Sequence, residues 1–221
     1  MVSRTIMKLA ILGATGPTGI FLTQQAVEAG HDVVLLVRNL QKVQMKHDSL
    51  TVAKGDIFSE SFLAEHFNGC DAVLSCLGTK ATFISKITFY TDSMKVIISA
   101  MRTAGIKRLV AITSWCTGYN RNDPGPAIIE WFLKPLILRT VLANMAEMET
   151  FLESDCNDID YTTVRPPGLK TDPPTEKPIQ VEERQFVGGG SSMMNRGDVA
   201  RFMLDIVNTE KWFKKFVAVA A

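Results

Sequence analysis

Three glycines spaced three residues apart follow the first apolar run of the chain. The run ends at Leu12, and the sequence continues G-A-T-G-P-T-G, with glycine at positions 13, 16 and 19. Between a strand and a helix, the first glycine permits a sharp turn, the second lets the backbone approach a phosphate, and the third lets the helix pack closely. Pro17 suits the first helical turn, where a missing N–H costs little. The pattern therefore predicts a strand, a nucleotide-binding turn and a helix.

Apolar runs and helical patterns then alternate along the chain. The runs are rich in Val, Ile and Leu, as in strands buried on both faces, and they cover residues 6–12, 32–37, 50–56, 71–78, 107–114, 160–166 and 214–221. Helices are expected over residues 18–30, 59–67, 91–104, 136–154 and 197–208. This alternation predicts an α/β fold with a Rossmann-type, doubly wound parallel sheet and helices on both faces.

Composition limits the remaining classes of protein. The chain has 221 residues, 46% of them hydrophobic and 21% charged, and its formal net charge is +1. These values favour a single domain over residues 1–221 and give no reason to expect a nucleic-acid or membrane partner. No apolar run approaches the ~20 residues that span a bilayer. Neither the four cysteines nor the three histidines show ligand spacing, so we expect no metal. Reduced thiols are typical of a cytoplasmic protein, and this is the location that we expect. We also expect a monomer.

Arg38 follows the second predicted strand, where dinucleotide-binding proteins select their cofactor. An acidic residue there holds the ribose 2′-hydroxyl of NAD, whereas arginine suits the 2′-phosphate of NADP. Lys42 adds a second positive charge nearby. The sequence thus favours NADP(H), although a solvated surface arginine is the alternative.

Asp56 and Gly78 follow the third and fourth predicted strands, at the edge of the sheet where ligands bind in open α/β folds. Asp56 could accept a hydrogen bond from the adenine amino group, with Ile57 against the ring. A simple loop aspartate is an equal alternative for Asp56.

Six short segments occur in an order that resembles one known superfamily. "LGATGPTG", "LLVR", "KGDIF", "LGT", "ITS" and "VRPP" resemble the atypical short-chain dehydrogenases/reductases, the NAD(P)-binding group with NmrA-like members, and within it the biliverdin-IXβ reductase and NADPH-dependent flavin reductase group. The resemblance implies a cofactor site made of Gly13, Thr15, Gly16, Pro17, Thr18, Gly19, Arg38, Asp56, Ile57, Leu77, Gly78, Thr79, Thr113, Ser114, Pro166 and Pro167. It also places Ser114 beside the centre of hydride transfer, so Ser114 is the expected catalytic residue; a capping serine at a strand end is the alternative.

Two positions depart from the resembled patterns. Val141 and Met145 stand where ordinary short-chain dehydrogenases carry the Tyr-x-x-x-Lys proton donors, which argues against alcohol oxidation and sugar epimerisation. Gly168 stands where the resembled biliverdin-IXβ reductases carry histidine after the proline pair. This glycine weakens the case for a tetrapyrrole substrate and favours a looser choice of acceptor.

The expected reaction is hydride transfer from NADPH to a planar acceptor, either a flavin such as FMN or biliverdin-IXβ. Loops at about 79–90 and 115–135 are expected to cover the acceptor, with Trp115, Phe83 and Gly168 contacting it. Trp131 is another candidate for this wall, but core packing explains it better. The alternatives are a non-catalytic NADP(H)-binding sensor or scaffold of the NmrA-like type, and a quinone or dye reductase.

Overall fold

The computed structural model describes residues 5–79, 86–118, 139–172 and 174–221. Its elements, in chain order, are β1 (Lys8–Leu12), α1 (Pro17–Glu28), β2 (Asp32–Val37), η1 (Leu40–Lys42), β3 (Leu50–Lys54), α2 (Glu60–Phe67), β4 (Ala72–Ser75), α3 (Phe89–Ala104), β5 (Arg108–Ile112), α4 (Arg139–Asp155), β6 (Asp160–Arg165), β7 (Gly168–Lys170), β8 (Gln180–Glu182), β9 (Met193–Asn195), α5 (Arg196–Ile206), η3 (Glu210–Trp212) and β10 (Lys215–Ala220).

The central sheet has the strand order β3-β2-β1-β4-β5-β6-β10-β8. The chain moves outward from β1 to β3, returns to place β4 on the other side of β1, and continues to β10. The strand order therefore reverses between β1 and β4, and the crevice at such a switch point is where open α/β sheets bind ligands. The glycine turn lies directly after β1, at this point.

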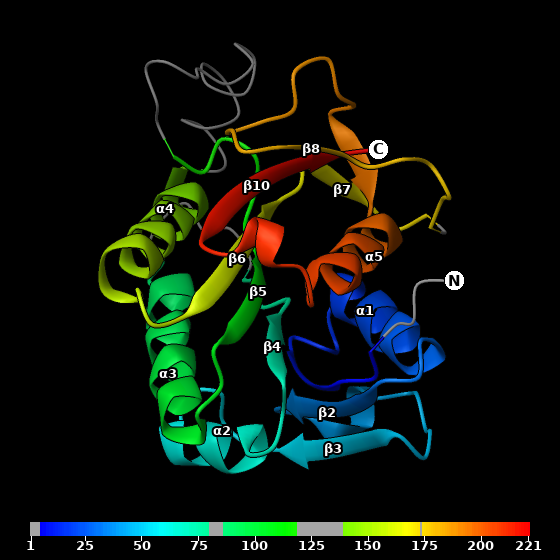
Figure 1. The fold of residues 1–221 in the computed structure, drawn as a ribbon, viewed down its shortest axis with the longest axis vertical. Helices are drawn as coiled ribbons and strands as arrows, with labels where there is room; N and C mark the ends of the chain where they lie inside the picture. The colour runs from blue at the N-terminus through cyan, green and yellow to red at the C-terminus, as the bar shows by residue number, and fades with distance from the viewer. Residues whose placement is uncertain (1–4, 80–85, 119–138, 173) are drawn as a thin grey trace.

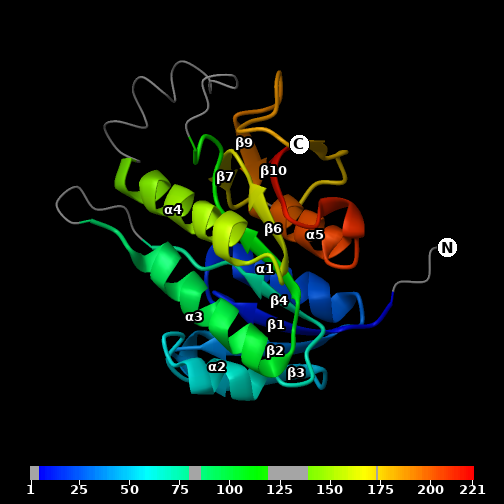
Figure 2. The same ribbon diagram turned by 60° about the vertical axis from the view of Figure 1, so that its left-hand side comes forward.

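Helices cover both faces of the sheet (Figure 1), as predicted. One face packs against α2, α3 and α4, which contribute Leu63, Ile97 and Met148 to its core. The other packs against α1 and α5, through residues such as Leu22 and Met203. Figure 2 shows the two groups on opposite sides of the strands. The α/β fold with a doubly wound sheet is therefore confirmed.

The sheet differs from the prediction at its far edge. β8 pairs antiparallel with β10, so the sheet is mostly rather than wholly parallel. A second, two-stranded sheet of β7 and β9 was also not predicted. All three strands are only three residues long and partly exposed, so they leave no long apolar run in the sequence.

The start of α3 also differs from the prediction and bears on the site. Thr88, at the N-cap position, makes no capping hydrogen bond with its side chain. Instead Oδ1 of Asn144, from α4, accepts hydrogen bonds from the backbone N–H groups of Tyr90 (2.8 Å) and Thr91 (3.4 Å). A buried side chain of one helix thus satisfies the first donors of another, and α3 begins at Phe89 rather than at residue 91.

Candidate functional site

The glycine turn is held by close backbone packing. Gly13 has a φ of +75°, and a Cβ there would lie 2.5 Å from the carbonyl oxygen of Cys76, at the end of β4. A Cβ on Gly19 would overlap the carbonyl oxygen of Gly13. Two of the three glycines are therefore required by the approach of main chain to main chain, as the sequence predicted.

The start of α1 is open to an anionic ligand. Gly16 is the N-cap residue, no side chain caps the helix, and the first turn contains no acidic residue. The free N–H groups and the dipole of this 12-residue helix therefore face the switch point without a side-chain cap or an acidic residue in the helix's own first turn. Thr15 and Thr18 belong to the same turn, with Pro17 at the first helical position. This arrangement fits the diphosphate of a dinucleotide.

A cavity of about 670 Å³ extends from this turn along α1. Ala14 and Thr15 line one end, Leu35 of β2 contributes apolar surface, and residues 41–46 form the opposite wall. The wall carries Lys42 and Lys46, and none of the described residues that line the cavity has a carboxylate. The cavity therefore has the electrostatic character expected beside a phosphorylated ribose.

Arg38 follows β2 and is exposed, and within the described ranges it makes no ion pair or hydrogen bond. Its guanidinium is thus available to an added phosphate. Asp56 is also exposed, but its Oδ1 accepts a hydrogen bond from the N–H of Phe58 (3.0 Å) in a local turn. Ile57 is buried in the core below it. Asp56 and Ile57 therefore follow the carboxyl end of β3, where a ligand could reach Asp56. The hydrogen bond from Phe58 also fits the alternative, in which Asp56 only stabilises its own loop.

Tyr90 organises the loop after β4, and sequence reasoning missed it. Its hydroxyl accepts a hydrogen bond from the N–H of Thr79 (3.3 Å) and lies 4.0 Å from the position of a Cβ on Gly78. Burial raises the pKa of Tyr90, so the phenol stays protonated at neutral pH. The buried tyrosine thus holds the backbone of Thr79, and its hydroxyl lies close to Gly78. A tyrosine in the first turn of an apolar helix gives no sequence signal for this contact.

The end of β5 presents two hydroxyl side chains with different surroundings. Thr113 is buried, and its Oγ1 donates to Oε1 of Glu149 (2.8 Å). Ser114 is partly exposed; its N–H donates to Thr117 Oγ1 (3.3 Å) and its carbonyl oxygen accepts from the same hydroxyl (2.5 Å). Nothing in the described part of the chain hydrogen-bonds to the Ser114 hydroxyl. Of the two, Ser114 is the one whose hydroxyl is available to a ligand.

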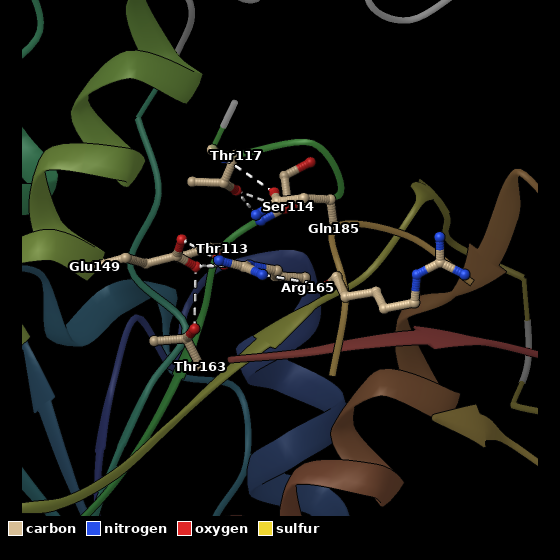
Figure 3. Close-up of polar contacts among 9 residues, drawn as sticks. Thr113, Ser114, Thr117, Glu149, Thr163, Arg165 and Gln185 are labelled. Carbon is tan, nitrogen blue, oxygen red and sulfur yellow. Dashed lines mark hydrogen bonds and ion pairs between the residues drawn. The ribbon is translucent and has the colours of Figure 1, made fainter. Parts of the chain in front are cut away.

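Beneath Ser114 lies a buried network that the sequence analysis did not predict (Figure 3). Glu149 of α4 pairs with Arg165 at the end of β6, with 2.7 Å between Oε2 and Nη2, and each side chain is at least nine-tenths buried. Oε1 of Glu149 also accepts from Arg165 Nε (3.0 Å) and from Thr163 Oγ1 (3.0 Å). The network joins α4 to the ends of β5 and β6. Its sequence signal is a carboxylate on the apolar face of a helix and an arginine ending a buried strand.

The two α4 positions that would carry Tyr and Lys in ordinary short-chain dehydrogenases are apolar and buried. Val141 and Met145 both pack in the core between α4 and the sheet. Burial also raises the pKa of Cys76 to about 12, so this residue beside the glycine turn remains a neutral thiol at neutral pH. Val141 and Met145 therefore carry no group that could donate a proton, and Cys76 is too weak an acid to do so at neutral pH.

Two of the expected acceptor contacts have other partners in the structure. Trp115 is buried: its indole N–H donates to the carbonyl oxygen of Val219 (3.1 Å), and its ring packs edge-on against Phe186. This geometry argues against Trp115 as an open aromatic wall. A Cβ on Gly168 would lie 2.5 Å from the sulfur of Met193, because β7 and β9 pair at this point, so a histidine would not fit without rearrangement.

The remaining predictions of the site concern four residues and two loops. Pro166 and Pro167 are buried directly after β6, and the carbonyl oxygen of Pro166 accepts from the N–H of Trp115 (2.9 Å), which ties them to the Ser114 segment. Phe83 and Trp131 lie outside the described residues, with half of the expected loop at 79–90 and most of the one at 115–135. In the described ranges, no group of His, Cys, Asp and Glu could hold a metal ion. No helix there is long and apolar enough to cross a membrane.

Comparisons with known proteins agree with this geometry. An uncharacterised chloroplastic protein of Arabidopsis thaliana is 26% identical over 221 residues, which cover 97% of this chain and 76% of that protein. Photosystem II assembly factor Ycf39 of Synechocystis is 33% identical over 106 residues, covering 47% of this chain and only 32% of Ycf39. The structure of SP1627 from Streptococcus pneumoniae, named as a candidate NADH-flavin reductase, has a TM-score of 0.79 at 20% identity and covers 97% of this chain and 99% of that one.

A family model described as NAD(P)H-binding matches residues 13–210. The match begins at the first glycine of the turn and includes Arg38, the loop after β4 and the ends of β5 and β6. With the open helix terminus at the switch point and the carboxylate-free cavity beside it, this match shows that the chain belongs to the NAD(P)H-binding family and that NAD(P)H is its cofactor.

Proposed function

We propose that this protein is an NADPH-dependent reductase that passes a hydride to a planar acceptor, either a flavin such as FMN or biliverdin-IXβ. One observation carries the choice of reaction. Among the described residues nothing hydrogen-bonds to the Ser114 hydroxyl at the end of β5. Val141 and Met145, the α4 positions where ordinary short-chain dehydrogenases carry Tyr and Lys, are buried and apolar. A reaction that takes its proton from solvent suits such a site better than alcohol oxidation does.

The chain's own residues would bind and orient the reactants. The N-terminus of α1 would hold the diphosphate, and Ser114 would donate a hydrogen bond to the nicotinamide amide. When bound, NADPH would supply the hydride from nicotinamide C4; the acceptor would take it up with one proton from water, and NADP⁺ would remain. Because no protein group has to donate that proton, placement of the two rings provides most of the rate acceleration.

The preference for NADPH over NADH rests on charge. Arg38 and Lys42 are exposed and have no acidic partner among the described residues, and the cavity beside them contains Lys46 and no carboxylate. Desolvated guanidinium–phosphate contacts are strong and bidentate, whereas NADH offers only a hydroxyl at this position. The similarity to a protein named as a flavin reductase supports the acceptor class, with the acceptor itself part of the proposal.

The direct test is NADPH oxidation by the purified protein with FMN, biliverdin-IXβ or a quinone as acceptor. We expect oxidation with FMN and slower oxidation with biliverdin-IXβ, because Gly168 supplies no side chain to the acceptor. Turnover with quinones alone would favour the quinone reductase alternative. Tight NADPH binding without any turnover would overturn the reductase and favour the NADP(H)-binding sensor.

A matched pair of variants tests the cofactor preference. Arg38→Glu should weaken NADPH binding at least tenfold more than NADH binding, because it replaces a phosphate partner with a repelling charge. Lys54→Glu makes the same charge change at the exposed end of the neighbouring strand β3 and should affect both cofactors alike. Equal loss of both cofactors in Arg38→Glu would contradict the 2′-phosphate assignment.

The monomeric state, the cytoplasmic location and the single-domain organisation expected from the sequence belong to the same proposal. Sedimentation of the purified chain with and without NADPH tests the first, cell fractionation tests the second, and limited proteolysis tests the third.

A further inference from the structure

The Glu149 carboxylate accepts hydrogen bonds from three side chains on two strands. Oε1 accepts from Thr113 Oγ1 (2.8 Å), Thr163 Oγ1 (3.0 Å) and Arg165 Nε (3.0 Å), and Oε2 accepts from Arg165 Nη2 (2.7 Å). An apolar pair of similar size is often as stabilising as a buried ion pair, or more so. Stability alone is therefore a weak explanation for two charges at this place in the core.

The position of the network suggests another role. Thr113 is fixed twice: its N–H donates to the carbonyl oxygen of Val164 (2.9 Å) and its hydroxyl donates to Glu149. The next residue is Ser114, whose backbone is held by Thr117, while its hydroxyl has no hydrogen-bond partner among the described residues. Figure 3 shows Glu149, Thr113 and Arg165 directed toward one another beneath Ser114. The direction of the Ser114 side chain therefore depends on how Thr113 is held.

We propose that Glu149 is a positioning residue, which acts through the Thr113 hydroxyl to fix the Ser114 hydroxyl at the nicotinamide. This inference rests on the proposed reductase function for the identity of the reaction. In this proposal α4 contributes to the site although it lacks Tyr and Lys at the usual positions. One turn beyond Met145 it supplies the Glu149 carboxylate, which orients the end of β5. Arg165 completes the network by balancing the buried charge.

The chain offers a matched pair of variants for the test. Thr113→Val and Thr163→Val each delete one buried hydroxyl that donates to the same oxygen of Glu149, with little change in shape. Both variants should lose similar thermal stability. Only Thr113→Val should lower kcat, by about tenfold, because small displacements of a reacting group are costly to rate. Thr163→Val should stay within about twofold of the wild-type chain, since Arg165 and Thr113 still hold the carboxylate.

Two further comparisons separate positioning from a general structural effect. Thr113→Ser keeps the donor and should restore most of kcat. In a Ser114→Ala background, Thr113→Val should produce little further loss, because the group that it positions is already absent. Independent effects that multiply in the double variant would overturn the proposal, as would equal losses of kcat in Thr113→Val and Thr163→Val.

Failure of this proposal is distinguishable from failure of the proposed function. If the wild-type chain oxidises NADPH with none of the acceptors, the reductase function is wrong. The Kd for NADP⁺ is then measured for the wild-type chain, Thr113→Val, Ser114→Ala and the double variant. Coupling between Thr113 and Ser114 in that Kd would still support the positioning role of Glu149. Independent effects on Kd would overturn it.

Discussion

The two ends of the candidate site are built in opposite ways. The glycine turn after β1 is shaped by backbone contacts, and no side chain caps α1. The ends of β5 and β6 are held by buried side chains, with the Glu149 carboxylate accepting hydrogen bonds from three of them. The first end depends on glycines within seven consecutive residues, 13–19. The second depends on residues that lie far apart in the chain and meet only when it folds.

We expect the largest loss of stability at the ends of β5 and β6, which are held by buried side chains. Glu149→Gln should lower the free energy of unfolding by about 3–5 kcal/mol, because it leaves the buried Arg165 without its anionic partner. The measurement is urea denaturation. Replacing both residues, as Glu149→Met with Arg165→Met, should recover much of this stability but not the turnover. Recovery of turnover as well would show that the network only stabilises the core.

A smaller loss, about 3 kcal/mol, is expected for Gly13→Ala at the backbone end, since the added Cβ meets the main chain of Cys76 in a left-handed conformation. Gly30→Ala is the matched control: Gly30 has a φ of +84° with nothing near the added Cβ, so only the conformational cost of about 1 kcal/mol applies. Urea denaturation compares the two. Equal losses would mean that crowding does not define the turn.

Asn144→Ala tests the contact between α4 and α3. It should cost about 2 kcal/mol, because the buried N–H groups of Tyr90 and Thr91 lose their acceptor. Ser59→Ala, which removes the local N-cap of α2, should cost about 1 kcal/mol. Thermal melts of both variants give the comparison. If Asn144→Ala costs no more than Ser59→Ala, the contact between helices is unimportant for the start of α3.

Tyr90→Phe removes only the hydroxyl that holds the loop after β4. The KM for NADPH should rise about fivefold, the effect of one lost hydrogen bond of about 1 kcal/mol, with the fold unchanged. Tyr161→Phe deletes another buried phenol, one that stacks on Phe216 away from the loop, and should leave KM unchanged. A similar KM in the two variants would remove Tyr90 from the site.

The smallest effect is expected for an ion pair outside both ends of the site. Arg102 donates two hydrogen bonds to the Asp158 carboxylate and lowers the pKa of that carboxyl from 3.8 to about 2. Because the folded pKa is the lower one, the pair stabilises the fold above pH 3.8 and loses this effect as the pH falls through about 2. Both side chains are exposed, so Asp158→Asn should cost less than about 1 kcal/mol at neutral pH. Melting temperatures of the two proteins should converge in acid; a constant difference would contradict the assignment.

The same contrast explains what could be predicted from the sequence. The glycine turn, the parallel strands β1 to β6 and the helices between them follow from local spacing and apolar runs, so they were predictable. Asn144, Tyr90 and the Glu149–Arg165 pair were not, because their partners are defined by the packing of α4 against α3 and the sheet. Trp115 shows the reverse error: an aromatic residue after a strand suggested an open wall, and tertiary packing placed its ring in the core.

A crystal structure with NADP⁺ and FMN tests the central claim most directly. We predict the diphosphate against the backbone of residues 13–19, the 2′-phosphate at Arg38, and the nicotinamide beside the Ser114 hydroxyl with the flavin ring stacked on it. A dinucleotide bound away from the glycine turn, or a nicotinamide out of reach of Ser114, would contradict the proposed reductase.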